Sequence, residues 1–183
     1  KTWLTDVKAI IPGHAHLDHI GAIPFLSKKF DCPILLTPYS NAVLEQISKD
    51  NKIPIPNKIR VLSDNSSYQL SKNITIEFIN VTHSIPDSVM VAIHTPDGTV
   101  LYTGDYKFDE NPMLGKTTNY KRLSELKNVR LLIMDSLYSS RQGRTPSELD
   151  AQASLEKTVF ESVSKKNGLI ITTFSSHISR LKS

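Results

Sequence analysis

The sequence has a single cysteine, no long apolar run and no internal repeat in its 183 residues. Cys32 has no second cysteine with which to form an internal disulfide, so a reducing cytoplasm is the simplest setting. No run reaches the ~20 apolar residues that a transmembrane helix needs, so we expect no membrane partner. These absences favour a soluble, cytoplasmic protein over a disulfide-linked or membrane-spanning one.

The composition is that of a globular protein. Hydrophobic residues make up 39% of the chain and charged residues 22%, which is enough for a packed core under an ordinary surface. The length predicts one domain, or one domain and a piece of a second. The net charge of +4 would suit a polyanionic partner, but a bias of this size is equally common in proteins that bind none.

The first part of the chain alternates between strand and helix patterns. The apolar run 7–11 predicts a short buried strand, and 20–30 predicts a helix despite Pro24. A second strand is expected over 32–36, followed by a helix in which Pro38 is the first residue. This order predicts a β-α-β-α beginning.

Short β-rich runs follow, and helices then return. The apolar and β-branched runs predict four strands, over 59–62, 74–81, 89–95 and 100–103. The last two are expected to form a hairpin around a Pro-Asp-Gly turn. The remaining elements are a helix, a buried strand, a long helix and a further strand, over 120–126, 129–134, 147–166 and 169–173. Helices and sheets are thus interleaved in layers, and the polar run 164–168 is the candidate domain boundary.

The stretch GHAHLDHIG, residues 13–21, gathers three of the six histidines and a carboxylate: His14, His16, Asp18 and His19. Neutral imidazole and carboxylate are ligands that Zn²⁺ prefers, and an alternating pair on extended backbone can point two rings at one place. Because Asp18 and His19 are adjacent, one loop can supply two metal centres. The cluster lies between a predicted strand and a predicted helix, and it predicts a metal site.

One loop cannot complete a four-coordinate shell, so further ligands are expected where later strands end. His83, Asp105 and Asp135 each follow a predicted strand. Asp135 has an alternative interpretation as a helix or turn cap. His94, which is alone on a predicted strand, is expected to be structural.

Four longer motifs accompany the cluster. They are THSIPDS at 82–88, TGDYKFDENP at 103–112, MDS at 134–136 and TPSE at 145–148. With the histidine cluster, these motifs resemble those of the β-CASP group of metallo-β-lactamase fold nucleases, and within that group the ribonuclease J family. Residues 171–180 are similar to the beginning of the β-CASP domain, so the resemblance runs almost end to end.

The resemblance implies a site with two zinc ions. One zinc would have three histidine ligands, the other would have two ligands from the first loop, and a carboxylate would bridge the pair: His14, His16 and His83; Asp18 and His19; Asp105. The histidine that completes the second zinc in the family is not among these residues. We therefore expect the second zinc site to be incomplete.

Three carboxylates are implied to be catalytic: Asp18, Asp105 and Asp135. Asp135 corresponds to an acidic motif that, in the family, orients a histidine from much later in the chain, which is thought to protonate the leaving oxygen. His177 does not match that histidine, and we interpret it as a surface or substrate-groove residue. Gly13 stands where the family usually has Thr or Ser, so we expect a loop that lacks one hydroxyl contact but keeps its ligands.

The implied fold is α/β, a four-layer αββα metallo-β-lactamase sandwich that is incomplete and carries the first strand of a β-CASP domain. Residues 1–167 would form the metallo-β-lactamase domain, without N-terminal strands and a C-terminal return, and 168–183 would begin the β-CASP domain. We therefore expect a fragment of a longer protein, which would be a homodimer or a higher oligomer.

The implied function is a zinc-dependent ribonuclease that hydrolyses phosphodiester bonds of single-stranded RNA in RNA processing and decay, as a 5′-3′ exonuclease and an endonuclease. The two zinc ions would generate hydroxide at neutral pH and bind the phosphate oxygens. The alternatives are a β-CASP DNA nuclease, another metallo-β-lactamase hydrolase, or an inactive zinc-binding truncated product. By themselves the 183 residues are expected to be nearly inactive, because the general acid and most of an RNA channel would be missing.

Overall fold

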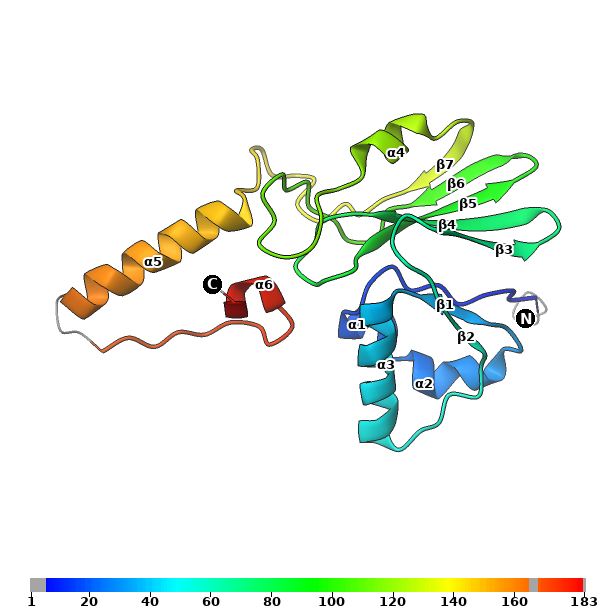
Figure 1. The fold of residues 1–183 in the computed structure, drawn as a ribbon, viewed down its shortest axis with the longest axis horizontal. Coiled ribbons are helices and arrows are strands. Elements are labelled where there is room, and N and C mark those ends of the chain that lie inside the picture. Colours follow the sequence, from blue (N-terminus) through cyan, green and yellow to red (C-terminus); the bar gives the residue numbers. More distant parts are fainter. Residues whose placement is uncertain (1–5, 165–167, 183) are drawn as a thin grey trace.

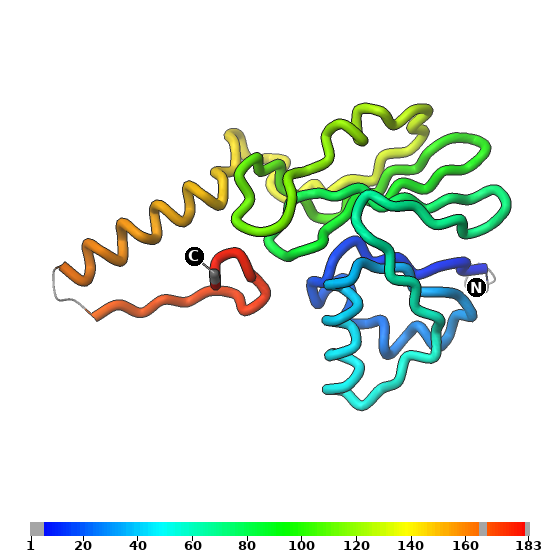
Figure 2. The backbone as a smooth tube through the Cα atoms, viewed as in Figure 1, coloured from blue at the N-terminus to red at the C-terminus, as the bar shows by residue number. Residues whose placement is uncertain are grey.

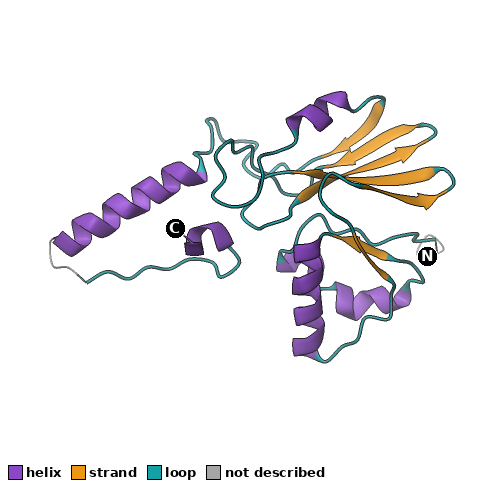
Figure 3. Ribbon diagram, viewed as in Figure 1, coloured by secondary structure: helices purple, strands orange, loops and turns teal. Residues whose placement is uncertain are grey.

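The computed structural model describes residues 6–164 and 168–182 (Figure 1). Within these residues, two β-sheets lie face to face and helices cover both outer sides (Figure 3). The small sheet pairs two parallel strands, β1 (Ile34–Leu36) and β2 (Ile59–Val61). The large sheet has five strands in the order β3 (Ser67–Ser71), β4 (Ile74–Asn80), β5 (Val89–Thr95), β6 (Gly98–Tyr102) and β7 (Val129–Ile133). Its pairs are antiparallel except for β6 and β7, which are parallel.

The helices of the described residues fall into three groups along the chain. They are α1 (Leu17–Ile20), α2 (Ile23–Leu26), the 3-10 turn η2 (Ser27–Lys29) and α3 (Pro38–Asn51); α4 (Tyr120–Glu125); and α5 (Glu148–Ser164) with α6 (Ile178–Lys182). Among these residues, no helix is long and apolar enough to cross a membrane.

Three apolar clusters hold the layers together. In β1, Ile34 and Leu36 face the helices and contact Leu44 of α3, whereas Leu35 faces the large sheet and lies with Phe78. This division follows from the alternation of side chains along a strand. On its other face the large sheet contacts α4 through a third cluster. The layer order is therefore α, β, β, α, which confirms the predicted sandwich.

The beginning of the chain differs from the prediction in two places. Instead of a strand over 7–11 there is an isolated bridge between Ile10 and Ile34, because Pro33 has no N–H with which to extend the ladder. The predicted helix over 20–30 is three short pieces. Here a proline is also the reason for the break before α2, since the nitrogen of Pro24 cannot donate to the carbonyl four residues earlier. The helix that begins at Pro38 is confirmed.

The later part of the chain requires three corrections. Strand β3 was not predicted, because its alternation depends on only two partly buried side chains, Tyr68 and Leu70. Strand β7 is exposed and not buried, since it is the edge of the large sheet. The predicted strand over 169–173, the first strand expected of a β-CASP domain, has no sheet partner among the described residues. The predicted boundary within 164–168 lies partly outside the described residues.

His94 has the structural role expected of it. Its ring nitrogens lie 2.7 Å from Glu77 Oε2 and 3.0 Å from Thr99 Oγ1, on three adjacent strands of the large sheet. Arg122 of α4 donates to both oxygens of Glu77, so the same carboxylate ties α4 to the sheet. These polar contacts hold α4 against the large sheet. Both ring nitrogens of His94 are used in them, so His94 is a structural residue and not a metal ligand.

Beyond β7 the chain extends away from the sandwich as α5 and then comes back (Figures 1 and 2). The return ends in α6, where Arg180 bonds Glu148 at the start of α5. The start of α5 and the helix α6 are therefore joined close to the sandwich.

Candidate metal centre

The first histidines lie on a loop that the large sheet holds by its backbone. The N–H of Val89, in β5, donates to the carbonyl of Gly13 at 2.9 Å. A Cβ atom on residue 13 would lie 3.1 Å from the carbonyl oxygen of Val89, so this close approach favours glycine. His14 and His16 follow directly.

His83 and Asp105 reach the same place from two strands of the large sheet. Strands β4 and β6 are both antiparallel to β5, which lies between them, so they run in the same direction. The residues after β4 and β6 therefore emerge at one edge of the sheet. Asp135 follows β7, which is parallel to β6, and emerges there too.

Four side chains converge at this edge, and we call them the metal centre: His14, His16, His83 and Asp105. One ligand atom from each lies within 4.8 Å of all the others. His16 Nδ1 and His83 Nε2 are 3.1 Å apart. Two nitrogens bound to a tetrahedral zinc at 2.0–2.1 Å lie about 3.3 Å apart, so this spacing suits a shared cation.

The protonation state of the histidines also suits a cation. Burial, followed by repulsion from the neighbouring histidines, lowers the pKa of His14 to about 2. Burial is also the main reason why the pKa of His83 falls to about 4 and why the pKa of His16 is lowered. All three rings are therefore neutral at pH 7, and each has a nitrogen lone pair that can bind a metal.

One buried atom lacks a partner without a metal. His14 is 1% exposed, and its Nε2 atom has no hydrogen-bond partner among the described residues. Leaving a buried polar atom unsatisfied costs about 1–3 kcal/mol, and a cation between His14 and Asp105 would remove that cost. The donor set and this orphaned nitrogen fit a divalent metal ion such as zinc.

Asp18 and His19 lie beside the metal centre, on α1. His19 Nε2 is 3.4 Å from Asp105 Oδ2 and 3.5 Å from Asp18 Oδ2. The same Oδ2 atom of Asp105 is 3.9 Å from His14 Nε2 and 4.0 Å from His83 Nε2. A single carboxylate oxygen therefore faces both ligand groups that the sequence predicted.

Asp135 lines the same groove as two residues of the metal centre. The groove has a volume of about 650 Å³, and His83, Asp105 and Asp135 are among the residues that line it. The carboxylate of Asp135 accepts the N–H of Leu137 at 2.7 Å. The backbone N–H of Asp135 donates to Thr103 Oγ1 at 3.1 Å. The turn-cap interpretation is thus realised, and a catalytic role for Asp135 stays a prediction.

His177 is not among the four side chains of the metal centre, although it lies close enough to His16 and His83 to help lower the pKa of both. Its Nδ1 atom is 3.0 Å from Ser179 Oγ, near α6. One contact of the metal centre was not predicted from the sequence. Ser84 Oγ lies 3.3 Å from His16 Nε2, whereas His83 lies next to the other ring nitrogen, Nδ1. The position of Ser84 directly after a predicted ligand was the available signal.

The fold and the site define a class of protein: an αββα sandwich with a histidine-rich metal centre at one edge of its large sheet. Residues 4–157 match the metallo-beta-lactamase superfamily, and the chain belongs to that superfamily. It is 42% identical to Ribonuclease J of Methanocaldococcus jannaschii over 97% of this chain and 40% of that protein. It is also 42% identical to Ribonuclease J of Pyrococcus abyssi over 96% of this chain and 40% of that protein. These matches confirm the resemblance stated from the motifs.

The chain spans about 40% of the length of these curated relatives. Among solved structures, it is similar to a protein of unknown function from Enterococcus faecalis V583, with a TM-score of 0.60 and 22% identity. That match covers 84% of this chain and 39% of the other, and it supports the fold alone.

Proposed function

We propose that the protein is a zinc-dependent ribonuclease of the Ribonuclease J type, which hydrolyses phosphodiester bonds of single-stranded RNA as a 5′-3′ exonuclease and an endonuclease. The observation that carries the proposal is the convergence of His14, His16, His83 and Asp105 in a chain 42% identical to a Ribonuclease J. A cytoplasmic location, an assembly of two or more copies and a domain boundary after residue 167 belong to the same proposal.

The proposed site would hold two zinc ions. His14, His16 and His83 would hold the first, Asp18 and His19 would contribute to the second, and Asp105 would supply a carboxylate to both. When bound, the pair supplies Lewis acidity toward phosphate oxygens and lowers the pKa of a water molecule. The distances support this division, because Asp105 Oδ2 lies 3.9 Å from His14 Nε2, 4.0 Å from His83 Nε2 and 3.4 Å from His19 Nε2.

The chain's own residues prepare this site. The unprotonated ring of His14 presents its unpartnered Nε2 atom to the centre. Ser84 orients the ring of His16 through its hydroxyl. Asp105 contributes a carboxylate to the place where the metal ions would bind. Asp18, whose side chain is exposed and lies 3.5 Å from His19, is positioned to hold a second ion.

The groove beside the metal centre supports a single-stranded substrate. Besides His83 and Asp105, aromatic side chains line it, and three of them stand in a row: Tyr106, Phe108 and Tyr120. Neighbouring ring centroids are 4.9 and 5.5 Å apart, and Phe108 is 46% exposed. Exposed aromatic faces stack on bases of unpaired strands, whatever their sequence. Arg144, which is 81% exposed and lies 3.9 Å from Glu110 at the same groove, offers a positive charge for a phosphate.

The test uses the protein as the cell produces it, loaded with zinc, and a labelled single-stranded RNA that carries a 5′-monophosphate. RNA cleavage that Asp105→Asn abolishes supports the proposal. Cleavage of a DNA of the same sequence, with the RNA left intact, favours a DNA nuclease. Zinc binding without cleavage of either strand favours an inactive zinc-binding product, and hydrolysis of small esters alone favours another hydrolase of the superfamily.

A further inference from the structure

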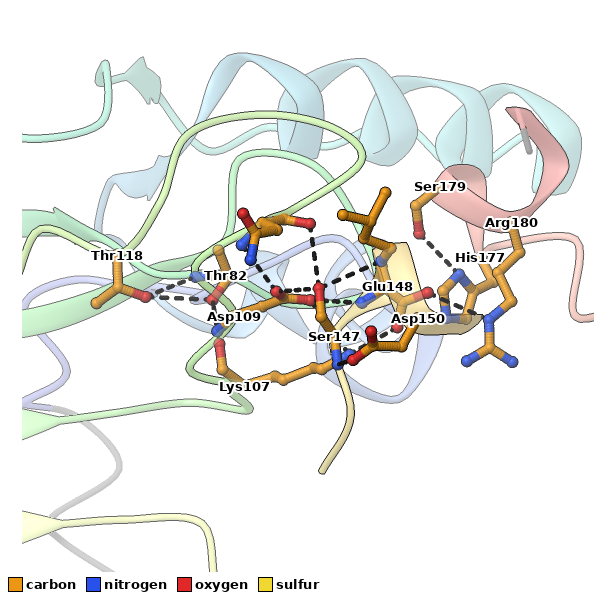
Figure 4. A network of polar contacts seen from close by, with 12 residues as sticks. Thr82, Lys107, Asp109, Thr118, Ser147, Glu148, Asp150, His177, Ser179 and Arg180 are labelled. Atoms are coloured by element: carbon orange, nitrogen blue, oxygen red, sulfur yellow. Dashed lines mark hydrogen bonds and ion pairs between the residues drawn. The ribbon is translucent and has the colours of Figure 1, made fainter. Parts of the chain in front are cut away.

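A continuous set of hydrogen bonds and ion pairs leads from Thr82, the residue before His83, to α5 and α6 (Figure 4). Its central residues are Thr82, Lys107, Asp109, Glu148 and Arg180. Three different parts of the chain contribute them: the end of β4, the loop after β6 and the segments around α5 and α6. The function proposed above uses none of these residues.

Thr82 joins the two loops that carry metal ligands. It directly precedes His83, and its carbonyl accepts the N–H of Lys107 at 2.8 Å. The Thr82 hydroxyl bonds the carbonyl of Lys107 and accepts the N–H of Asp109 at 3.2 Å. Lys107 is two residues beyond Asp105. The positions of His83 and Asp105 are therefore linked through Thr82, which is 5% exposed.

Asp109 fixes the start of α5 on the same loop. One of its carboxylate oxygens accepts the Ser147 hydroxyl at 2.8 Å, and the other accepts the N–H of Glu148 at 2.8 Å. The ammonium group of Lys107 lies 3.3 Å from the second oxygen. A carboxylate at the start of a 17-residue helix satisfies free N–H groups and is stabilised by the helix dipole.

Glu148 connects this loop to α6. Its Oε1 atom accepts from Lys107 Nζ at 2.8 Å, and its Oε2 atom accepts from Arg180 Nε at 3.2 Å. The Glu148 side chain is 13% exposed, so these charge-assisted bonds form away from most of the solvent. The Glu148 carboxylate thus binds the loop after β6 with one oxygen and α6 with the other.

We propose that Glu148 is a positioning residue for the metal centre, and that its bonds to Lys107 and Arg180 couple the placement of α6 to the geometry of His83 and Asp105. The inference rests on the metal site of the proposed function. When Arg180 holds Glu148, the carboxylate holds Lys107, and the loop keeps Asp105 at the distance that the histidines require. When that hold is lost, Lys107 keeps only Asp109 as an ion-pair partner, and the loop that carries Asp105 is held less rigidly.

The test measures zinc affinity by competition with a chromophoric chelator, and the absorption spectrum of the cobalt-loaded protein, which reports ligand geometry. Glu148→Gln keeps the shape of the side chain but removes its charge. It is expected to weaken zinc binding by about tenfold, the lower end of the effect of residues that orient metal ligands, and to change the cobalt spectrum. Glu161→Gln is the matched control, because Glu161 is in the same helix and its partner Lys157 is an exposed residue 3.9 Å away.

Variants of Arg180 test the coupling more directly than those of Glu148. Arg180 bonds Glu148, and because its side chain is half exposed, we expect the fold to tolerate its replacement. Arg180→Gln is expected to weaken zinc binding in the same direction, and Arg180→Lys to restore most of the affinity. Circular dichroism checks folding, and Arg180→Gln decides the matter if Glu148→Gln does not fold. Zinc affinity and cobalt spectra that match the wild type in every folded variant overturn the coupling. A wild-type protein that binds no zinc overturns the proposed function instead.

Discussion

Replacing Asp109 by asparagine should destabilise the fold most at neutral pH and least in strong acid. The Asp109 side chain is buried. Burial by itself raises its pKa, but the N–H groups of Glu148 and Asn111, the Ser147 hydroxyl and Lys107 outweigh burial and lower the pKa from 3.8 to about 2. The difference between these values corresponds to about 2 kcal/mol of stability at neutral pH.

The pH dependence follows from the direction of the change. Because the pKa of Asp109 is lower in the folded protein than in the unfolded chain, its stabilisation is fully present above pH 3.8 and is lost as the pH falls to about 2. Asparagine has no charge to lose, and its NH₂ group would face one of the donors that now point at the carboxylate. The gap between wild type and Asp109→Asn should therefore narrow below pH 3.8.

The assay is urea unfolding followed by circular dichroism, with a chelator present so that metal binding does not contribute. Wild type and Asp109→Asn are compared at about pH 7 and about pH 3, where the linkage predicts different gaps. Glu110→Gln is the control, because the Glu110 side chain is 71% exposed, and we expect little change from it. A gap that is the same at both pH values would refute the argument from charge and leave only a loss of packing.

Further predictions concern the metal centre. Elemental analysis after dialysis should find tightly held zinc, which His14→Ala should release with little change in circular dichroism; a folded wild-type protein that retains no zinc would contradict the metal assignment. Asp105→Asn should remove most RNA cleavage with little loss of fold, because an amide cannot supply the bridging negative charge; near-normal turnover would rule out the bridge. Asp135→Asn should slow cleavage by up to ~10²–10⁴-fold, the range for a general acid that has lost its support, while the zinc content stays constant. Parallel loss of zinc in that variant would make Asp135 a ligand.

The sequence indicated which side chains would converge better than it predicted the elements around them. His14, His16 and His83 were recognisable because imidazoles at metal-ligand spacing, directly after predicted strands, are typical of a metal site. The exposure of β7 was not recognisable. An apolar run indicates a strand, but whether the strand is buried depends on what lies beside it, and β7 is the edge of its sheet. Local pattern therefore predicts chemistry and strand positions, whereas burial depends on neighbours that are remote in sequence.

The polar set around Asp109 was missed for the same reason. Lys107, Asp109 and Glu148 lie in motifs that the sequence shows, but the motifs assign these residues no contacts, and their partners are 25 to 41 residues away. Only the fold shows that Asp109 is 4% exposed and accepts from the start of α5. A buried carboxylate must be paired, so its burial, once seen, points directly to its donors.

The register of the large sheet explains why ligands so far apart in sequence meet. Asn80, the last residue of β4, pairs with Val89 of β5, and Tyr102, the last residue of β6, pairs with Val91. His83 and Asp105 each follow three residues after these strand ends, so they leave neighbouring levels of the sheet with the same offset. A slip of one residue in either pairing would turn the strand's side chains to the opposite face and carry one ligand away from the other. The metal centre therefore depends on the apolar face of β5 that fixes both pairings, where Val89 and Val91 are almost fully buried.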